Sequence, residues 1–456
     1  MLERVQGLLP GIRIRGRRFG GNPALRMELH DNPHLSDLLA QYLRRHRGPA
    51  YLLADEVGPD GAVHFGRGGP YDEHSNREHL LGSKNGRPEC EATLVANRFC
   101  PDLPELQPLL EHVRPVDTRG EQKAVLRLGS IVERLWDVFT EGWQFVHWAE
   151  LIFQASILYE RGVTKQGGPV GAAFIVGCIE EAWSRAKHGF PYPIPPKLTT
   201  YVQSLRQEGT ATSFDQLKPF SLPYCAVILW RYFRLRAEKL RPFGILSVVN
   251  PREWLISWLE DAFLGELVYQ QRFFEAQPDA DRAIFGKVTC RGKEVLVAVV
   301  ISDQTRVHSV ITERHPEVVL TIVRRSSGHI QCFRRRSYQP VRIKGRMRFL
   351  AALIRAREQE KRGVPVSSWD ELTAVQGPLG AEQWFFDGRT GDIYCGTRTA
   401  PRVRASRLFN QELCEFTVTA LEDSWESVLD SFVAAHGGTA WERHVPADEP
   451  PAVAAE

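Results

Sequence analysis

Three stretches with different hydrophobic patterns follow one another along the chain, and this succession constrains the fold more than any other feature. Up to about residue 120, short alternating segments of apolar and polar residues are interleaved with segments of helical spacing. From residue 121 to about 281 the pattern is that of long helices rich in aromatic residues. From residue 282 onwards β-rich runs return. The sequence therefore predicts an α/β protein in which a helical region separates two strand-containing regions.

The length of the chain requires more than one folding unit. Its 456 residues exceed the roughly 250 residues beyond which a single hydrophobic core seldom grows. We expect an N-terminal α/β domain with a parallel sheet over residues 1–120, a helical region over 121–281 and a C-terminal α+β domain over 282–436. Residues 437–456 are rich in proline, alanine and acidic residues, which predicts a disordered tail.

The first predicted strand leads directly into a histidine. Residues 24–29 alternate between apolar and polar types, His30 follows, and leucines with helical spacing begin at Leu35. Further strands are expected over 50–53 and 62–65, and a helix over 91–99. Alternating strands and helices form parallel sheets, whose ligands bind at the carboxyl ends of the strands. His30 and Asp72 both fall at such ends.

The later regions carry clear start and stop signals. Asn250, Pro251 and Glu253 have the layout of a capping box, which predicts a helix from there to about residue 274. A hairpin is expected around Arg291 and Gly292. The remaining expected elements are strands over 318–323 and 330–333, a helix over 347–361 that ends at Gly363, and a hairpin over 384–394.

Positive charge is concentrated in one segment. The net charge is +3, yet residues 324–362 contain thirteen Lys or Arg against two Glu, so this segment carries +11 and the remainder −8 by subtraction (3 − 11). Such asymmetry predicts a surface that faces a polyanion. A solvated basic face, or a packing surface against the acidic remainder, remains an alternative.

Composition also indicates a compartment. The eight cysteines lie far apart without a C-x-x-C pair, which predicts reduced thiols and no zinc site. The N-terminus lacks the pattern of a signal peptide, so a cytoplasmic location is expected. No apolar run approaches the length of a membrane span, so no membrane association is expected.

Two clusters of polar residues have the chemistry of a divalent-cation site. The first contains His30 and His34, and the second is Asp72-Glu73-His74. Carboxylates and imidazoles from several loops bind Mn²⁺ or Mg²⁺. Paired cations of this kind supply the charge neutralisation and the activated water that hydrolysis of a phosphoester requires at neutral pH.

These motifs, in this order, resemble the DHH phosphoesterase superfamily, and their layout is nearest to its metal-dependent exonuclease branch. The resemblance covers residues 22 to 120 and implies a strand-end cleft that holds Mn²⁺ or Mg²⁺, with two metal ions possible. It implies a catalytic role for Asp72 and His74. The metal ligands that it implies are His30, His34, Asp55, Glu73 and Asp117.

The chain departs from the family pattern at two positions. Ser36 stands where the family has an Asp that bridges two metals, although Asp37 is adjacent. Glu73 stands where the family has a histidine ligand, and a carboxylate can also bind these metals.

A turn in the C-terminal region resembles, more loosely, the Gly-Gly-His turn of the substrate-binding domain that accompanies the DHH domain. It reads Ser327-Gly328-His329. A glycine turn flanked by arginines is also a plausible phosphate cradle on physical grounds, because the backbone can approach an anion there. The expected substrate-binding residues are Gly328, His329, Arg324, Arg325 and Arg334. As an alternative, His329 is a turn residue satisfied by local backbone.

The expected function is hydrolysis of phosphodiester bonds in single-stranded nucleic acid or short nucleotides. A second hypothesis is a degenerate DHH-like module that binds nucleic acid or a nucleotide without hydrolysing it. A third is a protein-interaction scaffold whose basic surface docks an acidic partner. The sequence leaves the oligomeric state open.

Overall fold

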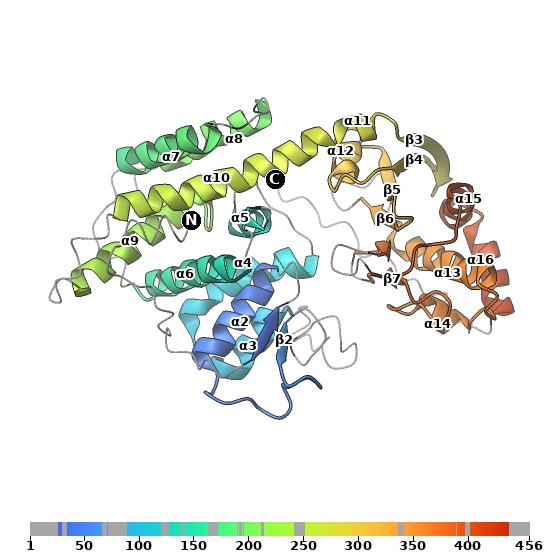
Figure 1. Cartoon of the computed structure of the whole chain (residues 1–456), viewed down its shortest axis with the longest axis horizontal. Coiled ribbons are helices and arrows are strands. Elements are labelled where there is room, and N and C mark those ends of the chain that lie inside the picture. The colour runs from blue at the N-terminus through green and yellow to red at the C-terminus, as the bar shows by residue number, and fades with distance from the viewer. Residues whose placement is uncertain are drawn as a thin grey trace. The chain divides into compact units, whose positions relative to one another are not determined.

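The structure is a computed structural model that describes most of the chain. The described residues are 26–29, 34–65, 71, 89–119, 127–136, 138–139, 142–162, 172–188, 190, 194, 196–210, 214–240, 251–335, 341, 343–388, 390–396 and 402–436. The chain is mixed α/β and divides into two compact units, Met1–Gln271 and Arg272–Glu456 (Figure 1). The domain boundaries expected near residues 120 and 281 remain predictions.

The first unit begins with a two-stranded parallel sheet. Strand β1 (Met27–Leu29) pairs in parallel with β2 (Val63–Phe65), and helix α2 (Leu35–Arg47) lies between them in sequence. Helix α3 covers Glu91–Phe99. The predicted parallel pairing and both helices are therefore confirmed.

The strand expected over residues 50–53 is a loop instead. Its neighbourhood is organised by Arg44, whose guanidinium donates hydrogen bonds to the backbone oxygens of Pro49 and Tyr51. Carbonyl groups that a strand would pair with a neighbouring strand are thus satisfied by a buried side chain.

Helices make up the rest of the first unit. They are α4 (Gln107–Arg119), α5 (Leu128–Leu135), α6 (Gly142–Glu160), α7 (Ala172–Lys187), α8 (Pro196–Gly209), α9 (Leu222–Leu240) and α10 (Pro251–Glu275), with short 3₁₀ helices at Pro104–Leu106 and Phe214–Gln216. One hydrophobic core joins them to the N-terminal elements, since Leu39 of α2 and Trp258 of α10 belong to the same cluster. The predicted aromatic helices therefore bury their aromatic stripes, as Trp148 and Trp183 illustrate.

The second unit is built on a six-stranded mixed sheet. Its strands are β3 (Ile284–Cys290), β4 (Lys293–Ile301), β5 (Val318–Arg324), β6 (Ile330–Arg334), β7 (Trp384–Phe386) and β8 (Ile393–Cys395), in the order β3-β4-β5-β6-β8-β7. Only β4 and β5 pair in parallel among these, and the crossover between them contains α12 (Val307–Arg314). The predicted hairpins and strands of this region are confirmed.

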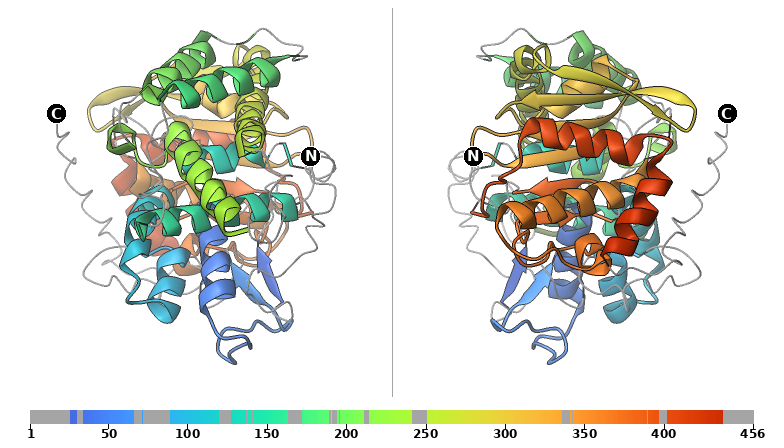
Figure 2. Two further views of the ribbon diagram at one scale, coloured as in Figure 1. Left: turned by 90° about the vertical axis from the view of Figure 1, so that its left-hand side faces the viewer. Right: turned by 90° about the vertical axis from the view of Figure 1, so that its right-hand side faces the viewer.

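Helices cover both faces of this sheet. Along β4, Val297 and Val299 face one core, whereas Ala298 and Val300 face a second core shared with α12 and α11 (Gln277–Ala280), as the two-residue period of a strand requires. Helices α13 (Lys344–Lys361), α15 (Asn410–Leu421) and α16 (Trp425–Ala435) pack on the first face (Figure 2, right), together with the short α14 (Trp369–Thr373).

Two predicted turns depend on left-handed backbone. Arg291 and Gly292 have φ of 53° and 69°, and the Asp423 carboxylate accepts hydrogen bonds from both of their N–H groups. Gly363, with φ of 68°, follows the end of α13.

None of the helices in the described part of the chain is long and apolar enough to cross a lipid bilayer.

Candidate functional site

Two of the expected metal ligands meet at the start of α2. His34 is the N-cap residue of that helix, and its Nδ1 lies 3.6 Å from Oδ1 of Asp117 in α4. The Asp117 side chain is 4% exposed and the His34 side chain is 46% exposed. Two ligand atoms that are each about 2.1 Å from one cation lie at most about 4.2 Å apart. One cation could therefore bind both atoms, and it would enter from the solvent-exposed side of His34.

The next residues of α2 supply one buried carboxylate and one buried hydroxyl. Oδ2 of Asp37 accepts a hydrogen bond of 2.6 Å from the His34 backbone N–H and lies 3.9 Å from His34 Nδ1. Ser36 is also buried, and its hydroxyl has no hydrogen-bond partner among the residues described. Where the motif resemblance leads us to expect a bridging carboxylate, Ser36 offers a neutral hydroxyl, with the carboxylate of Asp37 beside it.

Asp55 lies on the surface in an ion pair. Nη2 of Arg98 contacts both carboxylate oxygens of Asp55 at 2.9 Å. The hydrogen bond from Arg98 holds the pKa of Asp55 below its usual value. A cation would have to compete with Arg98 for this carboxylate.

The other expected residues of this site lie outside the described part of the chain. They are His30, Asp72, Glu73 and His74. Two residues that directly precede them are described: Leu29, which ends β1 and precedes His30, and Tyr71, which precedes Asp72.

A buried ion pair holds Tyr71. Arg44 of α2 and Glu56 are both fully buried and hydrogen-bonded to each other, and the Tyr71 hydroxyl donates a hydrogen bond of 3.0 Å to Oε2 of Glu56. Burial raises the pKa of Tyr71, and the adjacent Glu56 carboxylate raises it further, so the hydroxyl stays a donor. The sequence carries no signal for this cluster, because Arg44 stands in the basic run Arg44-Arg45-His46-Arg47 and Glu56 follows Asp55, so neither is marked as a buried charge.

A second group of possible ligands lies across the parallel strands. Glu28 of β1 is the register partner of His64 in β2, and one ligand atom of each, with one from Asp60, lie within 4.8 Å of one another. Oδ1 of Asp60 is 2.8 Å from His64 Nε2, and Arg26 forms ion pairs with Glu28 and Asp60. Arg26 therefore already supplies the positive charge in this group. The sequence signal was the polar middle residue of each three-residue strand.

In the C-terminal turn, hydrogen bonds within the protein satisfy His329. Its Nε2 is 2.9 Å from the Val403 backbone oxygen and its Nδ1 is 2.9 Å from the Ser327 hydroxyl. Gly328 has φ of 82°, and a Cβ on Gly396 would lie 2.5 Å from the His329 ring. This geometry matches the alternative in which His329 is a turn residue satisfied by its neighbours.

A carboxylate of the protein itself, that of Asp303, occupies part of the expected phosphate cradle. Asp303, which follows β4, accepts a hydrogen bond of 3.0 Å from the Ser326 backbone N–H. Hydrogen bonds from the Ser326 side chain and backbone lower the pKa of Asp303, so it remains an anion. The turn thus holds an anion that belongs to the protein.

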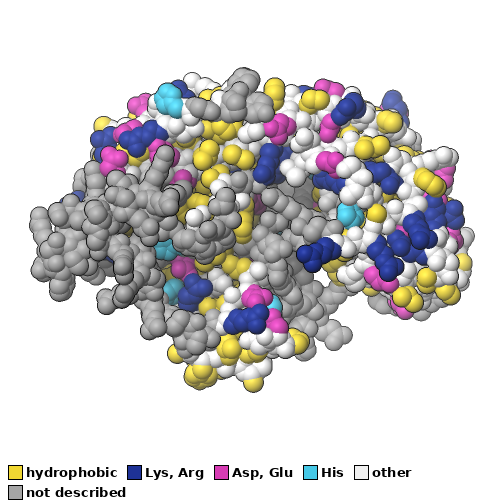
Figure 3. Space-filling model, in the orientation of Figure 1, with side chains coloured by type: hydrophobic (Ala, Val, Ile, Leu, Met, Phe, Trp, Pro, Cys, Tyr) yellow, Lys and Arg dark blue, Asp and Glu magenta, His cyan; other side chains and the backbone are white. Residues whose placement is uncertain are grey.

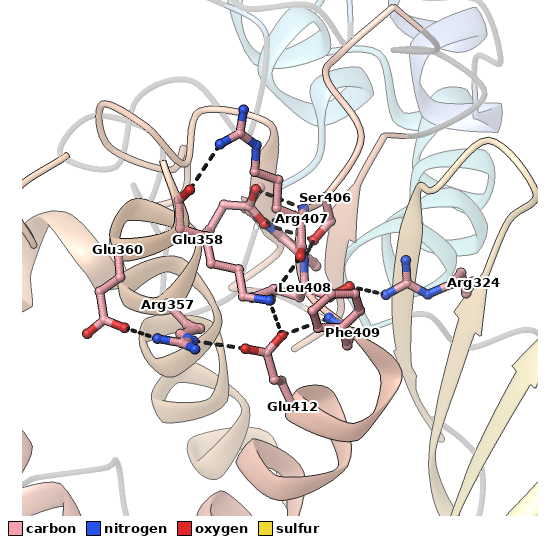
Figure 4. A network of polar contacts seen from close by, with 11 residues as sticks. Arg324, Arg357, Glu358, Glu360, Ser406, Arg407, Leu408, Phe409 and Glu412 are labelled. Carbon is pink, nitrogen blue, oxygen red and sulfur yellow. Dashed lines mark hydrogen bonds and ion pairs between the residues drawn. The ribbon is translucent and has the colours of Figure 1, made fainter. Parts of the chain in front are cut away.

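The three arginines expected to grip substrate also bind the protein. Arg324 donates to Asn410 and to the Leu408 backbone oxygen (Figure 4), and Arg325 donates to the backbone oxygens of Ser302 and Gln304. Nε of Arg334 donates to the Thr390 backbone oxygen at 2.7 Å. Burial lowers the pKa of Arg324 and of Arg325, both still cationic at neutral pH.

Other members of the basic segment are similarly engaged. Arg362 pairs with the buried Glu358, which also accepts hydrogen bonds from the hydroxyl of Ser406 and the backbone N–H of Arg407 (Figure 4). Lys361 and Arg357 pair with Glu412. On the face drawn in Figure 3, Lys and Arg side chains lie among Asp and Glu side chains. The charge count of the segment therefore overstates the positive charge that is available to a ligand.

A small cavity between α2 and α6 is lined by titratable groups. Its lining includes His46, His147 and Glu150, and Glu150 also pairs with Arg45. Burial lowers the pKa of His46 to about 4, lowers that of His147 and raises that of Glu150. No sequence motif marks this cluster, because its members come from two helices far apart in the chain.

Comparisons with known proteins add no further constraint. The chain matches no family model, no curated protein and no solved structure. Only the geometry of the described residues and the motifs of the sequence therefore bear on function.

Proposed function

We propose that the protein is a divalent-metal-dependent phosphoesterase that acts on phosphodiester bonds of single-stranded nucleic acid or short nucleotides. One observation supports this proposal most. Nδ1 of His34 lies 3.6 Å from Oδ1 of Asp117. The motif resemblance implies that both residues are ligands, although they come from segments far apart in sequence. An imidazole and a carboxylate at this separation suit one Mn²⁺ ion, and Mg²⁺ less well because it prefers oxygen ligands.

The residues of the chain have distinct roles in this proposal. His34 and Asp117 would hold the cation, together with the expected ligands His30, Asp55 and Glu73. A cation held there would neutralise charge on the phosphoryl oxygens and help to activate the attacking water. Asp37, through its hydrogen bond to the His34 N–H, fixes the N-terminus of α2 and so orients His34. The expected role of His74 is to contact the phosphate, with Asp72 beside it.

Turnover with added metal tests the proposal directly. Full-length protein with Mn²⁺ is incubated with labelled single-stranded RNA, single-stranded DNA and a dinucleotide, with Asp117→Asn assayed in parallel. We expect turnover that EDTA abolishes and that falls at least 100-fold in Asp117→Asn. Glu111→Gln is the matched control, because Glu111 is an exposed carboxylate on the same helix, and it should leave turnover unchanged.

Two results would contradict the proposal. One is equal turnover by Asp117→Asn and the unmodified protein, which would place the activity elsewhere. The other is the lack of both turnover and Mn²⁺ binding in the unmodified protein.

The buried hydroxyl of Ser36 favours a second candidate function, binding without hydrolysis. A neutral hydroxyl bridges two cations poorly, so the site would hold its ligand but lack one element of catalysis. In that case the same assay gives binding that weakens as salt rises, without turnover at any metal concentration.

A further inference from the structure

The two strands of the N-terminal sheet place one imidazole beside one carboxylate. Successive side chains of a strand point to opposite faces of its sheet. Val63 and Phe65 are fully buried, so His64 between them lies on the opposite face. The parallel register sets Glu28 of β1 directly beside His64 of β2. Backbone pairing, rather than a bond between the side chains, therefore brings these two groups together.

A tight turn before β2 adds a second carboxylate, that of Asp60. The turn is closed by a hydrogen bond of 2.8 Å from the Gly58 N–H to the Ala62 backbone oxygen. Gly58 packs directly against the imidazole, because a Cβ there would lie 2.9 Å from Cδ2 of His64. The turn thereby holds Oδ1 of Asp60 at 2.8 Å from Nε2 of His64.

The three side chains are close enough to share one cation. One ligand atom from each of Glu28, Asp60 and His64 lies within 4.8 Å of the other two. Two ligands of a tetrahedral Zn²⁺ ion, each about 2.1 Å from it, lie about 3.4 Å apart, so small side-chain rotations complete the geometry. The His64 side chain is 15% exposed, against 32% for Glu28 and 41% for Asp60. An ion would therefore enter from solvent past the two carboxylates.

The charge of this group also favours a cation. The one cationic side chain in contact with both carboxylates among the described residues is Arg26, whose Nη2 lies 2.7 Å from Oε1 of Glu28 and 3.9 Å from Oδ2 of Asp60. The hydrogen bond from His64 lowers the pKa of Asp60, which therefore stays ionised at neutral pH. Two carboxylates against one guanidinium leave one net negative charge. Because the Arg26 side chain is 59% exposed, it is free to turn into solvent when a divalent ion takes its place.

We propose that Glu28, Asp60 and His64 form a binding site for one Zn²⁺ ion, which joins β1 to β2 and displaces Arg26. The donor set selects the ion, because an imidazole suits Zn²⁺ better than it suits Mg²⁺ or Ca²⁺. Three protein ligands also leave the fourth position of the tetrahedron to water. The site shares no residue with the proposed phosphoesterase site, so it does not rest on the proposed function.

Two features limit the affinity of this zinc site. Arg26 competes with the ion for both carboxylates. In addition, Nδ1 of His64 is buried and has no hydrogen-bond partner among the described residues. A metal-bound histidine usually donates its second N–H to an acceptor, and such a partner is worth about 10- to 100-fold in metal affinity. We therefore expect a site that exchanges its ion and binds it less tightly than a structural zinc site.

Zn²⁺ titration of ligand variants tests the site. The parent chain for all of them is Asp117→Asn, so that the proposed phosphoesterase site does not contribute. Calorimetry then compares Glu28→Gln, Asp60→Asn and His64→Gln with this parent, and each should bind Zn²⁺ at least about 10-fold more weakly. The two carboxylates lie near the surface, so their variants are expected to fold even where His64→Gln does not.

Two further variants separate this site from surface binding. Arg26→Gln removes the competing cation and should strengthen Zn²⁺ binding by about 3-fold. His188→Asn is the matched control, because it removes an exposed histidine just after α7, and it should leave the affinity unchanged.

The outcomes are independent of the proposed function. Equal Zn²⁺ affinity in the parent chain, Glu28→Gln and Asp60→Asn would overturn the site, and so would the lack of Zn²⁺ binding in the parent. An unchanged or weaker affinity in Arg26→Gln would show that Arg26 does not compete with the ion. If the protein has no phosphoesterase activity but these variants weaken Zn²⁺ binding as expected, the proposed function fails and the zinc site stands.

Discussion

Among the residues that the structure describes, each unit buries one arginine completely, and the two are held in different ways. Arg44 in the first unit faces a carboxylate, Glu56, that also holds Tyr71. Arg355 in the second unit donates only to backbone oxygens, those of Leu372, Ala374, Val375 and Trp384. Burial lowers the pKa of Arg355 to about 10, so it is still charged at neutral pH.

The difference separates two uses of a buried charge. Arg355 holds a single stretch of backbone, from α14 to β7, against helix α13, so its role is confined to folding. Arg44 and Glu56 join segments that lie apart in sequence, namely α2, the loop 49–56, Tyr71 and Phe99 of α3. We therefore expect variants at Arg355 to affect one stretch of backbone, whereas variants at Glu56 should loosen several segments of the first unit at once.

The largest expected effect is that of Arg355→Met. Four backbone oxygens, two of them in buried hydrogen bonds and two in partly buried ones, would lose their donor at about 1 kcal/mol each, so we expect a loss of about 4 kcal/mol in the free energy of unfolding. Denaturant unfolding measures this loss. Where the variant still folds, its Mn²⁺ affinity should be unchanged, and a loss of affinity would show that the two units do not divide these roles.

Glu56→Gln should have a smaller effect on stability than Arg355→Met. It leaves Arg44 buried without a countercharge, which costs about 3 kcal/mol. Burial alone would raise the pKa of Glu56, but its hydrogen bonds, above all those from Arg44, lower it overall. A carboxylate with a lowered pKa stabilises the fold above its unfolded pKa of about 4.5, and that stability is lost as pH falls further. The variant should therefore lose part of the acid sensitivity that the unmodified protein shows below about pH 4.5, as measured by unfolding at a series of pH values.

The partners of the two buried arginines could not be predicted from the sequence, unlike several local elements of the fold. The hairpin turn at Arg291 and Gly292, the helix from Pro251 and the parallel pairing of β1 with β2 follow from local patterns, which neighbouring residues determine. The partners of Arg44 and Arg355 depend on tertiary structure, which local sequence does not show. The count of Lys and Arg over residues 324–362 therefore predicted a basic surface, whereas many of these side chains form hydrogen bonds within the protein. For the same reason the sequence selected His34 and Asp117 by motif but missed Glu56, which belongs to no motif.

Acid stability should also differ between the units. His46 and His147 of the first unit have lowered pKa values because they are buried, about 4 for His46. The unfolded chain binds these protons more readily, so the two histidines make the stability of the first unit rise from about pH 4 to pH 6.5, whereas Glu150, whose pKa is raised by burial, opposes part of this rise. In the second unit, burial of Glu412 is outweighed by hydrogen bonds, including one from Lys361, which lower its pKa to about 2. Its stabilising contribution is complete above about pH 4.5, so it gives no change between pH 5 and 6.5.

His46→Asn tests this difference. The histidine is only partly buried, so we expect the variant to remove about 1 kcal/mol of the pH dependence between pH 4 and 6.5. Hydrogen exchange resolved by peptide assigns the effect to a unit. The same pH dependence in peptides of the second unit, or an unchanged dependence in His46→Asn, would show that other groups control it.

The smallest effect on stability is expected for Arg98→Ala, which removes an exposed ion pair of the first unit. Asp55 and Arg98 form a bidentate ion pair at the surface of the first unit, and such pairs contribute little to stability. Arg98→Ala should therefore leave the unfolding midpoint almost unchanged. If Asp55 is a metal ligand, the variant also frees its carboxylate from a competing cation, and Mn²⁺ affinity should rise by about 3-fold because the competing hydrogen bonds are gone. Unchanged affinity would remove Asp55 from the ligand set while leaving His34 and Asp117 in it.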